Sequence, residues 1–266
     1  MAMNRIIVIT SGKGGVGKTT CTANLGMALA KSGKRVVVID ADFGLRNLDL
    51  LLGLENRIVY TALDVLAGEC RLDQALVKDK RQPNLALLPA AQNRSKESIT
   101  PEQMKKLVRA LTKAYNFVLI DSPAGIEMGF RNAIAAAREA IIVTTPEISA
   151  VRDADRVIGL LEANDVKAMR LVINRLKPAM VEAQQMMSVK DVQDILAVPL
   201  LGVIPDDEQV VVSTNNGEPL ILDKELSQAG TAVSNIARRL QGEKVPLMDL
   251  SVPKDSFFTK LRRLFD

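Results

Sequence analysis

The chain of 266 residues is long enough for one large α/β domain or two small ones. Hydrophobic residues make up 47% of it, but aromatics only 3%, so an aliphatic core such as a parallel sheet covered by helices is expected. The net charge is +4, and the last thirteen residues supply +2 of it, with four basic and two acidic side chains. The rest of the chain carries only +2, too little basic charge to indicate a nucleic-acid binder. The absence of histidine excludes the commonest general base and metal ligand, and the only cysteines, Cys21 and Cys70, lack the spacing of a zinc or iron–sulfur site. Acid–base work therefore falls to carboxylates, and any metal should be a hard, oxygen-bound ion such as Mg²⁺.

The first predicted elements are a buried strand at residues 6–9, a glycine-rich loop at 12–19 and a helix at 20–30. The loop, GKGGVGKT, matches the phosphate-binding pattern G-x-x-x-x-G-K-[ST] between a strand and a helix. Its glycines let backbone N–H groups turn toward a phosphate, Lys18 reaches the β- and γ-phosphates, and the Thr19 hydroxyl can ligate Mg²⁺. The predicted phosphate site comprises Gly14, Gly15, Val16, Gly17, Lys18, Thr19 and Thr20.

A second lysine in the loop, Lys13, has no role in the generic motif. One lysine is enough to hold the phosphates of one nucleotide. Lys13 is therefore either a solvated side chain or a group with a further function, and the loop alone leaves both interpretations open.

Two apolar strands downstream end in aspartate. Residues 34–40 end at Asp40, with Asp42 two residues later, and residues 117–121 end at Asp121 in the pattern of a Walker B strand, whose carboxylate holds Mg²⁺. Since ligands bind at the carboxyl ends of parallel strands, these aspartates are expected at the same edge as the phosphate loop. The alternative is that Asp40 and Asp42 only cap the next segment.

The rest of the chain alternates strands and helices. Strands are predicted at 84–89, 140–145, 169–174 and 200–205, and helices at 61–68, 101–111, 149–162, 189–196 and 229–240. Thr100 and Gln103 form a capping box before the second of these helices. Repeated βα units predict an α/β fold with a doubly wound, mostly parallel sheet and helices on both faces. One domain is expected over residues 1–242, followed by a linker at 243–255.

Residues 256–266 form the last predicted element, an amphipathic helix. Its apolar residues recur at the spacing of one helical face, and basic residues flank them, which is typical of a helix lying in a membrane interface with anionic lipid. The alternative is a helix docked on the protein's own core. The predicted membrane residues are Phe257, Phe258, Leu261, Arg262, Arg263, Leu264 and Phe265.

No signal peptide is visible, and no apolar run approaches the roughly 18 residues that span a membrane. The expected location is therefore cytoplasmic, and the predicted tail helix adds peripheral attachment to a membrane surface.

Together these segments resemble the MinD/ParA family of deviant Walker A ATPases. The resemblance rests on KGGVGKT in the loop, VIDAD at 38–42, GLRNLD at 44–49, DSPAG at 121–125 and VIP at 203–205. The segment at 44–49 and the tail are typical of the MinD-type, cell-division branch. The resemblance implies a P-loop NTPase fold, ATP and Mg²⁺ as cofactors, and slow hydrolysis in a sandwich dimer.

The resemblance also implies roles for single residues. Lys13 would reach the nucleotide of the partner subunit, Lys18 would hold the phosphates of its own, and Asp42 would orient the attacking water. The magnesium shell would contain Thr19, Asp40 and Asp121. Asn174, Pro205 and Asp206 would meet the adenine.

The implied function is an ATPase that dimerises with ATP, binds the membrane through its tail, and places the division site by recruiting a septum inhibitor. A MinC-like inhibitor and a MinE-like activator would dock near Asp153 and Asp155, although a solvated helix face is nearly as good an explanation of these acids. The alternative function is that of a ParA-type partition ATPase acting on DNA or other cargo. A nitrogenase-type reductase is disfavoured because no cysteine lies near residues 121–123.

Overall fold

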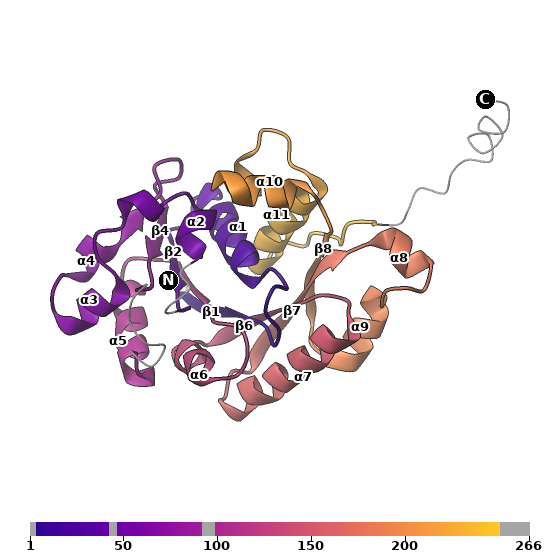
Figure 1. Cartoon of the computed structure of the whole chain (residues 1–266), viewed down its shortest axis with the longest axis horizontal. Helices are drawn as coiled ribbons and strands as arrows, with labels where there is room; N and C mark the ends of the chain where they lie inside the picture. The colour runs from indigo at the N-terminus through magenta and orange to yellow at the C-terminus, as the bar shows by residue number, and fades with distance from the viewer. Residues whose placement is uncertain (1–3, 43–46, 92–98, 251–266) are drawn as a thin grey trace.

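The computed structural model describes residues 4–42, 47–91 and 99–250. Its eight strands form one sheet in the order β3-β4-β2-β5-β1-β6-β7-β8 (Figure 1). The strands are β1 (Arg5–Thr10), β2 (Val36–Asp40), β3 (Val77–Lys78), β4 (Leu85–Leu88), β5 (Phe117–Asp121), β6 (Glu139–Thr144), β7 (Ala168–Leu176) and β8 (Leu200–Pro205). All neighbouring pairs are parallel except β3 with β4.

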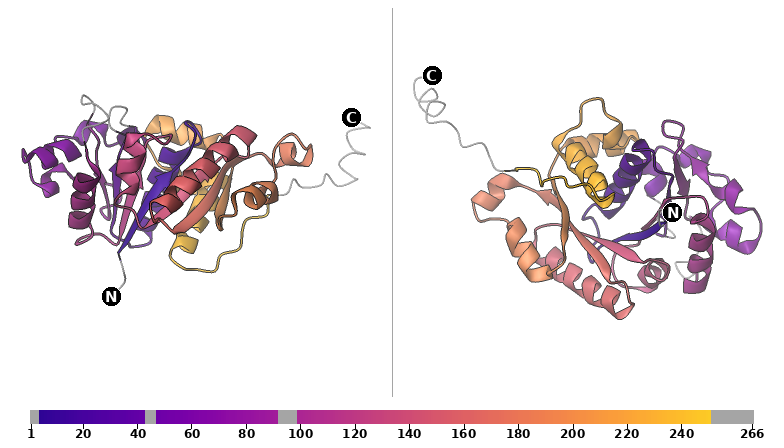
Figure 2. Two further views of the ribbon diagram at one scale, coloured as in Figure 1. Left: turned by 90° about the horizontal axis from the view of Figure 1, so that it is seen from below. Right: turned by 180° about the vertical axis from the view of Figure 1, so that it is seen from behind.

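Helices cover both faces of this sheet, as the two views in Figure 2 show. The α-helices are α1 (Lys18–Lys31), α2 (Leu48–Leu51), α3 (Ala62–Ala67), α4 (Leu72–Ala75), α5 (Pro101–Leu111), α6 (Met128–Ile134), α7 (Ile148–Ala163), α8 (Pro178–Glu182), α9 (Val189–Leu196), α10 (Gln209–Asn216) and α11 (Gln228–Leu240). Two short 3₁₀ turns, η1 (Glu55–Arg57) and η2 (Leu220–Leu222), complete the regular structure.

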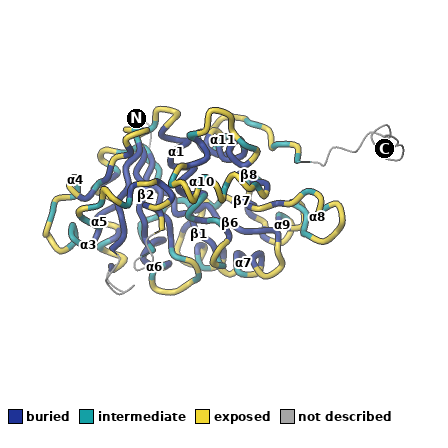
Figure 3. Tube along the Cα trace, turned by 45° about the horizontal axis from the view of Figure 1, so that its top comes forward, coloured by how far each residue is buried: buried dark blue, intermediate teal, exposed yellow. Residues whose placement is uncertain are grey.

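The core consists of two aliphatic layers, one on each face of the sheet. Alternate residues of β1 enter different layers: Ile6 and Val8 pack with α3, α5, α6, α7 and α9, while Ile7 and Ile9 pack with α1, α2 and α11. Because side chains alternate across a strand, an all-apolar strand fills both layers at once. The strands are buried along the trace in Figure 3, and the exposed segments lie on the outer helices and loops.

The strand order reverses at β1, which lies between β5 and β6. The chain leaves β1 into α1 on one face, and β5 and β6 lead into α6 and α7 on the other. A parallel sheet of this kind binds its ligands outside the carboxyl ends of the strands, at the switch point. The glycine-rich loop follows β1 and therefore occupies that position.

The predicted fold class is confirmed, and within the described residues the predicted strands and long helices appear with ends shifted by no more than a few residues. The capping box is also present: Thr100 Oγ1 accepts from Gln103 N at 3.3 Å, and Gln103 Oε1 accepts from Thr100 N at 2.8 Å. The described elements that the sequence did not reveal are short ones: β3, α2, α4, α6, α8, α10 and the two 3₁₀ turns η1 and η2.

The described part of the predicted linker, residues 243–250, contains neither helix nor strand and follows α11 closely. Arg239 holds it there, donating from Nε to Val245 O at 2.8 Å and from Nη2 to Pro246 O at 2.6 Å. The predicted membrane residues, 257–265, and residues 44–46 of the GLRNLD segment lie outside the described residues. Within the described ranges, no helix has both the length and the apolar character needed to cross a membrane.

Candidate functional site

The phosphate loop ends at Gly17, which caps α1 with φ of 92° and ψ of 22°. This left-handed conformation favours glycine, and a β-carbon here would also lie 2.3 Å from Asn174 Nδ2. The cap directs the first N–H groups of α1 toward the loop, which creates a site for an anion at the positive end of the helix dipole.

Two contacts from distant parts of the chain fix the shape of the loop. Asn174, at the end of β7, donates from Nδ2 to Val16 O at 2.8 Å. At the other end of the loop, Gly12 packs against the backbone of α7, since a β-carbon on Gly12 would lie 2.2 Å from Asp153 O. The loop is therefore clamped between β7 and α7 and is organised for binding by the fold itself.

Lys18 is the buried cation of the site. Its Nζ lies 3.5 Å from Asp121 Oδ1 on β5, and that carboxylate also accepts a hydrogen bond of 3.0 Å from Thr22 Oγ1. Burial raises the pKa of Asp121, and the charge of Lys18 with hydrogen bonds from Thr19 and Thr22 opposes the rise. The predicted phosphate lysine and the predicted Walker B aspartate thus lie together.

Asp40 lies beside Asp121, because the two residues are paired in the register of β2 with β5. Its Oδ1 accepts from Asp42 N at 3.0 Å and its Oδ2 from Leu48 N at 3.3 Å. Burial raises the pKa of Asp40 to about 7, with the charge of Asp121 adding to the effect and the two backbone N–H groups opposing it. Two carboxylates this close and this buried favour a bound cation or a proton between them.

The donor set fits Mg²⁺. Among the described residues no three acidic or cysteine side chains form a metal cluster, and the predicted ligands are a hydroxyl, Thr19, and two carboxylates, Asp40 and Asp121. Mg²⁺ is usually held by one or two carboxylates, with water and substrate phosphates completing its shell. Asp42 Oδ1, which is buried without a hydrogen-bond partner among the described residues, adds a further acceptor at this edge.

We expect Asp40→Asn to stabilise the protein in Mg²⁺-free buffer at pH 8. The pKa of Asp40 rises from an ordinary 3.8 to about 7 in the folded chain, so the folded state keeps a proton that the unfolded chain releases. The stability due to that proton is complete below about pH 4 and is lost as the pH rises through about 7. A pKa shift is worth roughly 1.4 kcal/mol per unit, and the asparagine loses part of this because it binds Leu48 N–H less well than the carboxylate does. The free energy of unfolding of Asp40→Asn at pH 8 should therefore exceed that of the wild type by an amount on the order of 1–3 kcal/mol.

Denaturant unfolding of both proteins at pH 5 and pH 8 measures this effect. The difference in free energy of unfolding between the variant and the wild type should be smaller at pH 5 than at pH 8. Mg²⁺ with nucleotide should stabilise the wild type more than the variant. A variant that is less stable than the wild type at pH 8 without Mg²⁺ would contradict the assignment.

Lys13 is half-exposed and contacts residues at the start of α7 in the same chain. Its Nζ lies 3.3 Å from Glu147 Oε2 and donates to Ser149 Oγ at 3.1 Å. An exposed ion pair of this kind contributes about 0–1 kcal/mol, so exchanging it for another anion costs little. The ammonium therefore lies at the outer edge of the loop, accessible to a second molecule.

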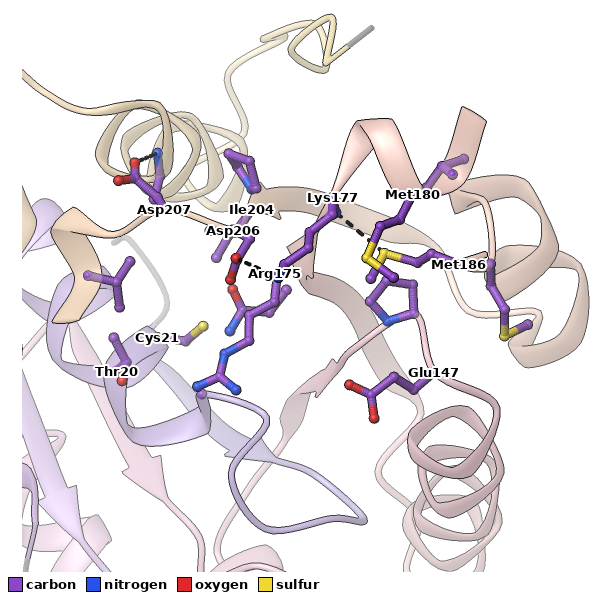
Figure 4. A pocket seen from close by; sticks show the side chains of 18 of the residues that line it. Thr20, Cys21, Glu147, Arg175, Lys177, Met180, Met186, Ile204, Asp206 and Asp207 are labelled. Carbon is purple, nitrogen blue, oxygen red and sulfur yellow. Dashed lines mark hydrogen bonds and ion pairs between the residues drawn. The ribbon is translucent and has the colours of Figure 1, made fainter. Parts of the chain in front are cut away.

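The structure contains a cavity of about 1120 Å³ between the start of α1, the carboxyl ends of β7 and β8, and the segment around α8 (Figure 4). Residues predicted to meet adenine, Asn174, Pro205 and Asp206, all line it, and so do Gly17 and Thr20 of the phosphate site. The volume exceeds what most ligand pockets of 300–1,000 Å³ provide, so a nucleotide fits. That these residues contact adenine stays a prediction.

The two predicted partner residues differ in their surroundings. Asp155 is exposed on α7, whereas Asp153 is half-buried, has its backbone against Gly12, and lies 3.7 Å from Arg156. Of the pair, Asp155 is the better placed to meet another protein.

Three residues at the site were not found from the sequence. Glu147 and Ser149 contact Lys13, and Arg175 lines the cavity. Their positions directly after β6 or at the end of β7 are the one signal that could have identified them, because strand ends at this edge form the site.

Comparisons with known proteins agree with this geometry. Residues 7–220 match the family described as the CobQ/CobB/MinD/ParA nucleotide binding domain. The septum site-determining protein MinD of Synechocystis is 65% identical over 261 residues, which cover 98% of each chain. Among solved structures, the MinC:MinD cell division protein complex of Aquifex aeolicus has 51% identity and a TM-score of 0.87, over 93% of this chain and 100% of that one. The septum site-determining protein of Pyrococcus horikoshii complexed with Mg-ADP has 34% identity and a TM-score of 0.82, over 91% and 100%.

Proposed function

Because the chain belongs to the MinD group of the MinD/ParA nucleotide-binding family, we propose that it is an ATPase that dimerises with ATP, binds the membrane through its C-terminal helix and recruits a septum inhibitor. The observation that carries the proposal is the meeting of a two-lysine phosphate loop with Asp40, Asp42 and Asp121 at one edge of the sheet.

In the proposed reaction, Lys18 and the loop N–H groups hold the β- and γ-phosphates of ATP. Thr19, Asp40 and Asp121 hold Mg²⁺, which when bound neutralises charge on the phosphates. Asp42 orients a water molecule at the γ-phosphate. Asn174, Pro205 and Asp206 receive the adenine, and their place along the cavity next to Gly17 supports this assignment.

Dimerisation is supported by apolar side chains around the same edge. Leu50, Ile126, Met128, Ile148, Val211 and Val212 are large apolar residues with 45–66% of their surface exposed. All of them lie in segments that follow the carboxyl ends of strands β2, β5, β6 or β8, and the phosphate loop follows β1 at the same edge of the sheet. Exposed apolar surface of this extent marks an interaction site, and a second copy facing this edge would bring Lys13 to the partner's nucleotide.

The chain mass in solution with ATP and with ADP tests this function. We expect a dimer with Mg-ATP and a monomer with Mg-ADP. Cosedimentation with anionic vesicles or with DNA then distinguishes the two candidate binding targets, a membrane and DNA. ATP-dependent binding to vesicles supports a MinD-type role on the cytoplasmic face of the inner membrane, whereas ATP-dependent binding to DNA alone supports a ParA-type partition ATPase.

Partners of the MinC-like inhibitor and MinE-like activator type are expected to bind α7 near Asp153 and Asp155. We expect Asp153→Ala/Asp155→Ala to weaken binding of a MinC-like inhibitor by about tenfold, because acids on a rim steer basic partners. Glu162→Ala is the matched control, an exposed acid at the far end of the same helix. Binding is measured by titration with the ATP-bound dimer, and equal affinity of the double variant and the control would remove the assignment.

A further inference from the structure

Arg175 lines the cavity, and the function proposed above gives it no role. Its backbone has φ of 57°, a left-handed conformation that is unfavourable for a residue with a β-carbon. Such conformations persist where the surrounding structure enforces them, often at ligand sites. A feature of the local fold must therefore cause this conformation of Arg175.

The cause is a bulge at the end of β7. The register of β7 with β8 shifts between Ile173 and Leu176, and both of these residues belong to the same core layer although they are three positions apart. In a regular strand, residues three apart face opposite sides. The extra residue turns Arg175 away from that layer and into the cavity, and bulges next to functional sites commonly redirect a side chain in this way.

In the cavity the side chain of Arg175 points toward the first turn of α1, where Thr20 and Cys21 lie (Figure 4). Burial raises the pKa of the Cys21 thiol to about 12 with a contribution from Asp121, and the charges of Lys18 and Arg175 oppose that rise, in agreement with a guanidinium close to this turn. The other cation of the cavity wall, Lys177, is paired with Asp206 at 3.3 Å. Within the described ranges, the side chain of Arg175 has no hydrogen bond or ion pair.

We propose that Arg175 is a nucleotide-binding residue whose guanidinium holds the α-phosphate of the bound nucleotide. The inference rests on the proposed ATP site. Lys18 serves the β- and γ-phosphates, and the predicted adenine residues Asn174 and Pro205 line the cavity, so the α-phosphate lies between them, at the turn that Arg175 faces. A guanidinium can donate two parallel hydrogen bonds to a phosphate. Since ATP and ADP share the α-phosphate, Arg175 sets the retention of both.

The test measures dissociation constants for ATP, ADP and GDP by displacement of a fluorescent ADP analogue. We expect Arg175→Gln to weaken ATP and ADP by the same factor, about tenfold or more, and to leave the ratio of ADP to GDP affinity unchanged. Arg175→Lys should recover part of the loss. Lys167→Gln, which removes one exposed cation just before the opposite end of β7, should stay within twofold of the wild type.

Arg175→Gly separates binding from folding, because glycine adopts a φ of 57° without strain. We expect a melting temperature equal to or above that of the wild type together with the same loss of affinity. Unchanged ADP affinity in Arg175→Gln, a loss restricted to ATP, or a changed preference for adenine over guanine would each overturn the inference. A wild-type protein that binds no nucleotide would instead overturn the proposed function itself.

Discussion

The Lys13→Ala variant is expected to bind ATP nearly as well as the wild type while losing both dimerisation and hydrolysis. Lys18, buried beside Asp121, and the N–H groups of the loop remain to hold the phosphates. Lys13 instead lies at the exposed edge of the loop, where its contacts are to Glu147 and Ser149. A charge supplied in trans to the transferring phosphoryl group is worth about 10³–10⁵ in rate, so turnover should fall by at least about 10³-fold.

Nucleotide titration, light scattering with ATP, and phosphate release measure the three properties separately. Lys105→Ala is the matched control, since Lys105 is a similarly exposed lysine paired with a glutamate, Glu102, at 2.7 Å. Asp42→Ala provides the contrast: it should dimerise with ATP and hydrolyse it slowly, because only the orientation of the water is lost. Normal dimerisation and turnover of Lys13→Ala would show that the lysine acts in neither role.

Strand ends could be predicted from the sequence because the strands of a parallel α/β sheet are buried on both faces. Each strand is therefore a nearly continuous apolar run, and it ends where the run ends. β8 begins and ends where the apolar run does, and the two runs that end in Asp40 and Asp121 place both carboxylates at the same edge of the sheet; that β2 and β5 are neighbours was not predicted. The phosphate loop is equally local, since its glycines and lysine are adjacent in the chain. Those features therefore needed no tertiary information.

The short elements depend on contacts that the sequence does not display. β3 has two residues and forms only by pairing with β4, and α10 carries the exposed valines Val211 and Val212, so it has no apolar stripe of its own. At the site, Lys13 meets side chains 134 and 136 positions away, and the left-handed turn at Arg175 arises from the register of β7 with β8. Residue patterns along one segment carry no trace of such pairings.

Deletion of residues 254–266 is expected to abolish ATP-dependent membrane binding while leaving nucleotide binding intact. These residues lie outside the described part of the chain, and the described residues end at Leu250, which packs against the same core layer as Leu200 and Val203 of β8. The nucleotide site, from Lys13 to Asp121, contains none of the deleted residues. The loss should therefore appear in vesicle flotation and not in ATP titration.

The need for ATP follows from the energy of a single tail. Burial of five apolar side chains gains roughly 7–15 kcal/mol and three bases near an anionic surface add about 3, while ordering ten residues costs roughly 10–20. One tail is thus marginal, whereas two tails on a dimer gain about 10²–10⁴ in avidity. Flotation with anionic liposomes should show strong binding with ATP and weak binding with ADP.

Two single substitutions test the predicted helical face with the same change of charge. Leu261→Glu places a carboxylate in the apolar stripe and should reduce ATP-dependent flotation by at least about tenfold, because a charge must enter the interface or the stripe must leave it. Thr259→Glu places the same carboxylate off the stripe and should weaken flotation less than Leu261→Glu, because it costs only the repulsion from anionic lipid, about 1 kcal/mol per tail. Equal binding with ADP and ATP, undiminished binding after the deletion, or equal losses from the two substitutions would each rule out a tail that binds as an amphipathic helix in pairs.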